Sequence, residues 1–227
     1  MATIAFISQK GGVGKSTLSR ALAREIAANG LTVKIADLDS QQTTTADWHR
    51  LRMSQGISPS VAVQAYSTAA EALRESTNFD YFIVDAPARA SKGTLELAKR
   101  ADLVVQPTGA SLDDLRPAVR VFHELSKAGI PVERLAFALS RIGTAAEEQD
   151  ARSYLAASGY SVLSGALMEK PSYRAAQNQG KAITETKYPS LNALADKMIA
   201  DIAARLSQPT EEIPHGQIRE TQNFPTP

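Results

Sequence analysis

The stretch Gln9-Lys10-Gly11-Gly12-Val13-Gly14-Lys15-Ser16-Thr17 decides the fold of this chain. A short β-branched and aromatic run, residues 3–7, precedes it, and Leu18, Leu22 and Ile26 recur at intervals of four after it. The order strand, glycine loop, helix is the context in which a P-loop pattern becomes a structural prediction. Backbone N–H groups of such a loop turn inward around an anion, and the helix directs the positive end of its dipole to the same place. The stretch therefore predicts a phosphate-binding loop.

Two side chains of the loop suit a nucleotide bound with magnesium. Lys15 can reach the β- and γ-phosphates, and the Ser16 hydroxyl can ligate Mg²⁺. The loop departs from the usual G-x-x-x-x-G-K-[ST] pattern, because Gln9 stands where the first glycine is expected and Lys10 precedes the glycine pair. The string K-G-G-V-G-K-S-T is the deviant Walker A signature, and with it the chain resembles the ParA/MinD superfamily of ATPases.

Three aspartates follow predicted strands. Asp37 and Asp39 come directly after residues 32–36, and Asp85 follows the buried run 81–84. Parallel strands end at one edge of a sheet, so these carboxylates lie beside the P-loop, where ligands bind in such folds. An apolar strand that ends in aspartate is the Walker B form, which makes Asp85 the predicted partner of a Mg²⁺ held by Ser16. The resemblance implies that Asp39 orients the attacking water and that Asp37 lies near the metal; either could instead be a turn aspartate.

The resemblance also implies a dimer joined by ATP. Lys10 is expected to reach the partner's phosphates, where a lysine supplied in trans stabilises developing negative charge. The expected catalytic residues are therefore Lys10, Lys15 and Asp39, and the expected metal ligands are Ser16, Asp37 and Asp85. The expected nucleotide-binding residues are Lys10, Gly11, Gly12, Val13, Gly14, Lys15, Ser16, Thr17, Arg141 and Pro171. Of these, Arg141 is a candidate for stacking on adenine, or an ordinary surface arginine.

The rest of the chain alternates strands and helices, which predicts one doubly wound, mostly parallel α/β domain over residues 1–207. Pro107 is expected to stop a strand, and Pro117 is expected to lie in the first turn of a helix. Residues 208–227 form a polar, proline-containing tail that is expected to be disordered. Further strands are predicted at 32–36, 61–65, 81–84, 103–106, 135–139 and 162–167. Helices are predicted at 15–29, 46–54, 68–76, 92–100, about 113–128, 147–158, 173–179 and 190–206.

Composition narrows the class of protein. The chain has 227 residues, 43% apolar and 22% charged, which is ordinary for a globular protein. A net charge of +1 gives no global attraction to nucleic acid or membrane, so any such surface must be local. The absence of cysteine excludes disulfides, Cys-ligated zinc and iron–sulfur clusters. No run of about 18 apolar residues is present, and we expect neither a signal peptide nor a membrane span.

A basic C-terminal region is the candidate DNA surface. Family members that partition DNA bind it non-specifically through this part once dimerised with ATP, and two copies of such a patch would make a salt-sensitive surface. An ordinary solvated face is the alternative for each residue. The family also shows a switch segment after the Walker B aspartate, here Asp85-Ala86-Pro87-Ala88-Arg89, in which alanine replaces the second proline. The candidate DNA-binding residues are Lys170, Arg174, Lys181, Lys187 and Lys197.

The sequence favours one branch of the superfamily. The missing cysteines argue against iron–sulfur and arsenite-pump types, and the tail lacks the amphipathic basic helix of a MinD type. We therefore expect a small ParA-type partition ATPase without an N-terminal helix-turn-helix domain. Expected partners are a second copy, non-specific DNA and a ParB-like centromere-binding or cargo adaptor protein, without a membrane, at a cytoplasmic, nucleoid-associated location. The alternatives are a scaffold that positions a protein complex and a MinD-like site-selection ATPase.

Overall fold

The computed structural model describes residues 1–39, 44–88 and 92–206. Across those residues a single seven-stranded sheet has the order β3-β2-β4-β1-β5-β6-β7. Every neighbouring pair of strands is parallel, which confirms the predicted α/β fold. The strands are β1 (Ala2–Ser8), β2 (Val33–Asp37), β3 (Ala62–Ala65), β4 (Tyr81–Ala88), β5 (Leu103–Thr108), β6 (Leu135–Ile142) and β7 (Ser161–Met168).

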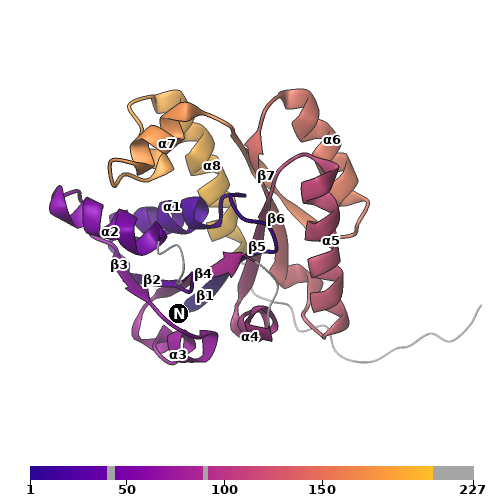
Figure 1. Cartoon of the computed structure of the whole chain (residues 1–227), viewed down its shortest axis with the longest axis horizontal. Coiled ribbons are helices and arrows are strands. Elements are labelled where there is room, and N and C mark those ends of the chain that lie inside the picture. The colour runs from indigo at the N-terminus through magenta and orange to yellow at the C-terminus, as the bar shows by residue number, and fades with distance from the viewer. Residues whose placement is uncertain (40–43, 89–91, 207–227) are drawn as a thin grey trace, which may run out of the picture.

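Helices cover both faces of the sheet (Figure 1). One apolar core lies between the sheet and α3, α4, α5 and α6, and a second lies between the sheet and α1, α7 and α8. Helix α2 lies beside α1 and the edge strand β3. The helices are α1 (Lys15–Ala28), α2 (Thr44–Ser54), α3 (Ala69–Leu73), α4 (Lys92–Arg100), α5 (Leu112–Lys127), α6 (Ala145–Ala156), α7 (Pro171–Gln177) and α8 (Pro189–Leu206), with 3₁₀ turns η1 (Ser76–Asn78), η2 (Val132–Arg134) and η3 (Ile183–Glu185).

The centre of the sheet sets the place of the site. Strand β1 lies between β4 and β5, and six of its seven residues are buried, the exception being Ala2. Asp37 at the end of β2 pairs in register with Asp85 in β4, which brings both carboxylates to the same edge as the loop after β1. This edge is the carboxyl end of the parallel strands, where the order of strands reverses around β1.

Two prolines behave differently from the prediction. Strand β5 continues through Pro107, because pairing with β1 ends at Val105 and only β6 remains a neighbour there. A residue without an N–H group is tolerated where a strand has lost one neighbour. Pro117 lies inside α5 beyond its first turn, where it removes one helical hydrogen bond. Leu115 and Phe122, on either side of it, are buried in the core, and this packing holds the helix together.

The backbone of the edge strand β7 is bound by side chains at residues 163–165. Arg152 of α6 donates to the carbonyl oxygens of Leu163, Ser164 and Gly165, at 2.7, 2.7 and 3.2 Å. Asp201 of α8 accepts from the Gly165 N–H at 2.7 Å. Helices from the two opposite layers therefore both bind the backbone of this strand.

Two expectations concern segments outside the described residues: Arg89 of the switch segment and the tail 208–227. Among the residues that are described, no helix combines the length and apolarity needed to cross a membrane.

Candidate nucleotide site

The loop after β1 has the backbone of an anion cradle. Gly12 and Gly14 have φ angles of 75° and 106°, a region that residues with a side chain rarely adopt. A Cβ atom on Gly14 would lie 2.6 Å from the Ser140 hydroxyl. Gly14 is also the N-cap of α1, and no side chain of the described residues caps that helix end. The first N–H groups of α1 thus face the loop without a side-chain acceptor, as phosphate binding requires.

Lys15 begins α1 and is only 8% exposed. Burial lowers the pKa of Lys15, and the charges of Asp85 and Asp39 oppose that shift. The structure therefore brings together the predicted lysine and two of the predicted carboxylates, from three different segments of the chain. A lysine held among acids at a helix N-terminus is placed for contact with phosphate oxygens.

Asp85 is buried, with 1% exposure, and only one of its two carboxylate oxygens has a hydrogen-bond partner among the described residues. Its Oδ2 accepts from the Thr45 hydroxyl at 2.8 Å. Its Oδ1 is buried without a hydrogen-bond partner among the described residues. Burial raises the pKa of Asp85, while the nearby hydroxyls of Ser16 and Thr45 act against the rise. An unpartnered buried carboxylate oxygen beside a serine hydroxyl is a natural ligand pair for a hard cation.

Asp37 is equally buried but uses both oxygens on the backbone. Its Oδ1 accepts from the Asp39 N–H at 3.0 Å and its Oδ2 from the Ala46 N–H at 3.2 Å. Burial raises the pKa of Asp37 despite these bonds. Asp37 thus shapes the turn after β2 and holds the start of α2, and a direct bond from it to a metal stays a prediction. Asp39 is half-buried near Lys15, as its predicted role requires.

A cavity of about 260 Å³ lies between the P-loop and α7, and we call it the α7 cavity. Thr17, Tyr173 and Gln177 line it together with Gly12 and Gly14. Because it opens directly from the glycine loop, it is the natural place for the nucleoside of a bound nucleotide. Its remaining lining residues are Ser140, Arg141, Leu167, Met168, Glu169, Lys170 and Arg174.

Arg141 lies at the rim of this cavity in a strained conformation. Its φ is 58°, and it is the one residue other than glycine with positive φ among those described. Its Nη1 donates to the Gly12 carbonyl at 3.0 Å and its Nε to Glu169 at 2.9 Å. Strain of this kind is typical of functional positions. The side chain fastens the P-loop, and its stacking on adenine stays a prediction. Pro171 opens α7 but lines a different groove, with Lys181 and Lys187.

Lys10 forms an ion pair within its own copy. Its Nζ contacts Asp114, near the start of α5, while the Lys10 side chain stays 50% exposed. Both residues line a second cavity, of about 450 Å³, on the other side of the P-loop. The structure thus places Lys10 at an open surface beside the loop, and its reach to a partner's phosphates stays a prediction.

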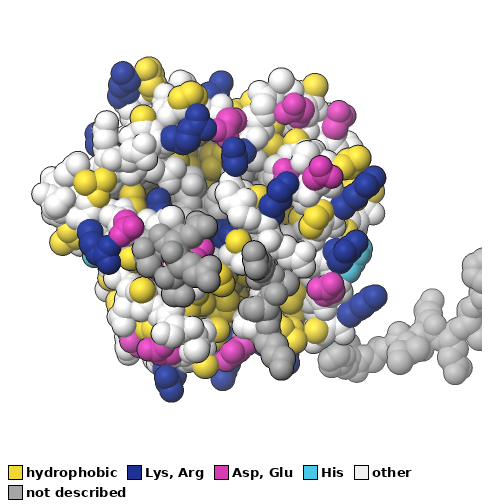
Figure 2. Space-filling view, in the orientation of Figure 1, with side chains coloured by type: hydrophobic (Ala, Val, Ile, Leu, Met, Phe, Trp, Pro, Cys, Tyr) yellow, Lys and Arg dark blue, Asp and Glu magenta, His cyan; other side chains and the backbone are white. Residues whose placement is uncertain are grey.

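The candidate DNA-binding residues gather around α7, with one exception. Lys170 and Arg174 border the α7 cavity, Lys181 and Lys187 line the next groove, and Lys197 lies on α8. Four of them are exposed, whereas Lys181 is half-buried. Figure 2 shows basic side chains over the α7 and α8 corner, mixed with acidic and apolar groups. Arg174 is paired with Glu169, which reduces its charge for other partners.

Sequence reasoning missed several residues of the site. Thr45 binds Asp85, Gln177 lines the α7 cavity, and Arg20 contacts both Thr45 and Gln177. None of them belongs to a motif. The sequence carries no signal for them, because the burial of Arg20 beside Ser19, Ala21 and Leu22 appears only in the folded chain.

The residues present fit a nucleotide with Mg²⁺. The glycine loop has the backbone for an anion, and within the part of the chain that the structure describes the α1 end has no side-chain cap and Asp85 Oδ1 has no hydrogen-bond partner. The described residues contain no group of three or more His, Cys, Asp or Glu side chains that could hold a metal by themselves. Magnesium bound through one or two protein ligands plus phosphates and water needs no such group. Ser16 and Asp85 are therefore the side chains that would hold it.

Comparison with known proteins agrees with this fit. The family model described as the CobQ/CobB/MinD/ParA nucleotide binding domain matches residues 4–183. A search of curated protein sequences finds no match.

Similar solved structures share the fold at low sequence identity. MinD of Pyrococcus horikoshii OT3 complexed with Mg-ADP is 17% identical, with a TM-score of 0.72, over 90% of this chain and 96% of that one. An ATP complex of a McdA variant from Cyanothece is 18% identical, with a TM-score of 0.66, over 89% of this chain and 96% of that one. A ParA family ATPase from Chlorobium tepidum TLS is 18% identical, with a TM-score of 0.64, over 87% of this chain and 98% of that one.

Proposed function

Because this chain belongs to the CobQ/CobB/MinD/ParA nucleotide-binding domain family, we propose that it is a Mg²⁺-dependent ATPase that moves or positions DNA. The observation that carries the enzymatic part is the buried Asp85, whose Oδ1 has no partner in the described chain, beside the uncapped end of α1. The reaction is hydrolysis of ATP by water to ADP and phosphate.

The side chains divide the work as follows. The P-loop N–H groups and Lys15 bind the phosphates, and Ser16 with Asp85 holds Mg²⁺. The metal, when bound, neutralises charge on the phosphate oxygens. Asp39 orients the attacking water, and Asp37 keeps Asp39 in place through the bond between its Oδ1 and the Asp39 N–H. Arg141 holds the loop through the Gly12 carbonyl.

The active form is a homodimer with ATP between the copies. Lys10 supports this part because it is half-exposed beside the P-loop, next to a cavity that a second copy can fill. To reach a partner's phosphates, Lys10 must leave Asp114, so the ion pair favours the single copy. Phosphate charge from the partner's nucleotide is the stronger attraction for this lysine once the two copies meet.

The basic residues around α7 and α8 bind DNA phosphates without reading sequence, and only the dimer presents enough of them. A ParB-like centromere-binding or cargo adaptor protein then stimulates hydrolysis and releases the dimer from the nucleoid. Two copies of one patch multiply weak phosphate contacts, which is why dimerisation can switch DNA retention on.

Retention on immobilised duplex DNA of unrelated sequence tests this function. We expect retention with ATP and Mg²⁺, little with ADP or no nucleotide, none for Lys15→Ala, and a steep loss between about 50 and 200 mM salt. The double variant Lys187→Ala, Lys197→Ala is expected to lose retention. The matched control, Lys99→Ala with Lys127→Ala, removes two exposed lysines from the opposite layer and is expected to retain DNA.

Equal retention in all three nucleotide states would contradict the DNA switch. ATP-dependent dimerisation without DNA retention would instead favour a scaffold that positions a protein complex.

A further inference from the structure

Arg20 is a buried cation that belongs to no motif. It lies in α1 with 8% exposure, and its guanidinium Cζ is 5.6 Å from the centre of the Trp48 ring. Its Nε donates to the Thr45 hydroxyl at 3.2 Å, and its Nη1 donates to the Gln177 side-chain oxygen at 3.3 Å. One guanidinium therefore joins the start of α2 to the end of α7.

The contact with Arg20 determines where the Thr45 hydroxyl directs its hydrogen. A hydroxyl has one hydrogen, and Arg20 occupies a lone pair of this one. The Thr45 hydrogen is consequently left for Asp85 Oδ2, which lies 2.8 Å away. With Oδ2 engaged, Oδ1 is the oxygen of Asp85 that remains buried without a partner within the described chain. Arg20 thus selects, through Thr45, which oxygen of Asp85 is available.

The contact with Gln177 extends the chain of contacts to the α7 cavity. The Gln177 oxygen also accepts from the Thr17 hydroxyl, at 3.2 Å, so it holds α7 against α1. Thr17 and Gln177 both line that cavity. Two nitrogens of one guanidinium therefore contact Thr45, which binds the proposed metal ligand Asp85, and Gln177, which lines the α7 cavity.

We infer that Arg20 is a positioning residue, which orients Asp85 through Thr45 and ties that carboxylate to α7 through Gln177. Arg20 does not touch the nucleotide itself. This inference rests on the proposed function, and it adds that binding of Mg²⁺ and binding of nucleotide are coupled through a guanidinium. The surrounding charges suit the role. Burial lowers the pKa of Arg20, and the negative charges of Asp85, Asp37 and Asp47 oppose that shift. Partners outside the immediate ligands commonly control metal affinity in this way.

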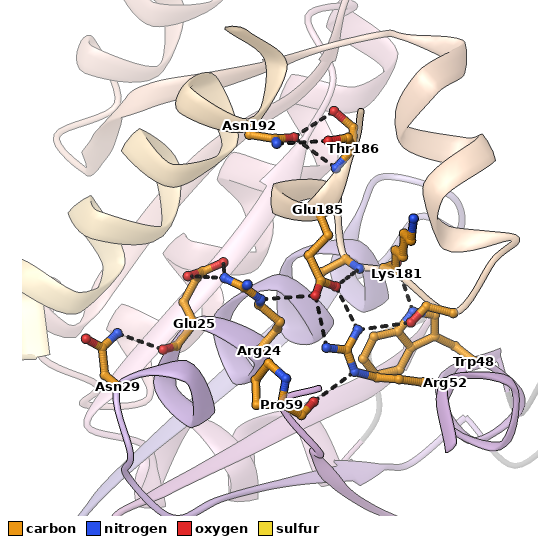
Figure 3. A network of polar contacts seen from close by, with 12 residues as sticks. Arg24, Glu25, Asn29, Trp48, Arg52, Pro59, Lys181, Glu185, Thr186 and Asn192 are labelled. Atoms are coloured by element: carbon orange, nitrogen blue, oxygen red, sulfur yellow. Dashed lines mark hydrogen bonds and ion pairs between the residues drawn. The ribbon is translucent and has the colours of Figure 1, made fainter. Parts of the chain in front are cut away.

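Other contacts hold α2 in place independently of Arg20, as Figure 3 shows. Arg52 is fully buried, forms two hydrogen bonds with Glu185 at 2.7 and 3.0 Å, and also stacks near Trp48. Trp48 donates to the Lys181 carbonyl at 3.0 Å. A change at Arg20 therefore leaves α2 anchored, and its effect can be measured in a folded protein.

The test measures ADP affinity by calorimetry, with Mg²⁺ and with a chelator, in the full chain. The ratio of the two affinities is the coupling between metal and nucleotide. A purely structural defect weakens both affinities and leaves the ratio unchanged. The variants are Arg20→Gln, Thr45→Val, which keeps the side-chain shape without the hydroxyl, and Thr45→Ser, which restores the hydroxyl. The matched control is Arg24→Gln on the same helix, where Arg24 bonds Glu25 and Glu185 instead.

We expect Arg20→Gln and Thr45→Val to lower the ratio about tenfold. Thr45→Ser and Arg24→Gln are expected to keep the wild-type ratio. Emission from Trp48, the single tryptophan of the chain, checks that α2 keeps its native surroundings in the Thr45 variants. Urea unfolding is the folding check for Arg20→Gln, because Arg20 itself lies against the Trp48 ring. If Arg20→Gln fails to fold, the comparison of Thr45→Val with Thr45→Ser decides the question.

An unchanged ratio in both Arg20→Gln and Thr45→Val would overturn the positioning role and leave the proposed function standing. A wild-type protein that binds no ADP, or binds it equally with and without Mg²⁺, would overturn the proposed function and this inference together.

Discussion

The loop at residues 9–17 and the C-terminal segment at 171–206 are built in opposite ways. The loop gets its shape from its own backbone, with two glycines at positive φ between a central strand and its helix. The segment is placed by side chains that are distant in sequence, through pairs such as Arg52 with Glu185 and Thr17 with Gln177. The difference teaches that the phosphate cradle is shaped by local backbone, whereas the C-terminal segment beside it is held by contacts between distant parts of the chain.

The largest effect is expected from removing a long-range contact. Arg52→Leu removes the fully buried arginine and leaves the half-buried Glu185 with fewer partners, which should lower the free energy of unfolding by about 3–5 kcal/mol. The control Arg50→Ala, two residues earlier on α2, breaks an exposed pair with Asp47 and should cost less than about 1 kcal/mol. Urea unfolding measures both. Equal costs would mean that the C-terminal segment does not depend on this pair.

The next largest effect is expected at Lys15, where a substitution should impair ATP hydrolysis without changing the fold. Lys15→Ala should lower kcat for ATP hydrolysis by about 10²–10³-fold, because a charged group aimed at the phosphates is lost. Its unfolding midpoint should stay close to the wild-type value, in contrast to Arg52→Leu. Phosphate release and urea unfolding are measured on the same sample, with Lys127→Ala as the exposed-lysine control. A Lys15→Ala protein that hydrolyses ATP at the wild-type rate would contradict the site.

Backbone shape in the loop is tested by two glycines. Gly14→Ala and Gly159→Ala both place a side chain at positive φ, with φ of 106° and 80°, which costs about 1–2 kcal/mol. Only at Gly14 does the new Cβ also collide, with Ser140 Oγ at 2.6 Å, whereas nothing lies within 4 Å at Gly159. Gly14→Ala should therefore abolish ADP binding in calorimetry, and Gly159→Ala should preserve it. Preserved binding in Gly14→Ala would show that the loop tolerates another shape.

The smallest effect is a pH dependence of stability at Glu185. Burial alone would raise the pKa of Glu185, but bonds and charges from Arg52, Ala182 and Arg24 outweigh it and lower the pKa below its usual 4.5. A carboxylate with a lowered folded-state pKa stabilises the fold above about pH 4.5, and this contribution is lost as pH falls through the lower folded value. Urea midpoints between about pH 6 and pH 3 should fall more in the wild type than in Glu185→Gln. Parallel curves would contradict this contribution.

Much of the fold and part of the site could be predicted from the sequence, because both follow from patterns over a few neighbouring residues. The glycine loop, the aspartates that follow strands, and the parallel order of strands are of this kind. Arg20, Thr45 and Gln177 could not be found, because their roles arise only when three separate helices meet. Pro107 was misjudged for a related reason: its cost depends on whether a neighbouring strand is present, which the residue itself does not reveal.

Arg152 of α6 and Asp201 of α8, which bind the backbone of the edge strand β7, affect how copies of this chain can associate at high local concentration. Where many copies of a protein are close together, their sheets can join edge to edge, because the unpaired backbone groups of an edge strand can pair with a strand of another copy. Arg152 and Asp201 already occupy that backbone, from helices on opposite sides. At residues 163–165 the outer backbone of β7 is therefore already engaged and is not available to pair with a strand of another copy.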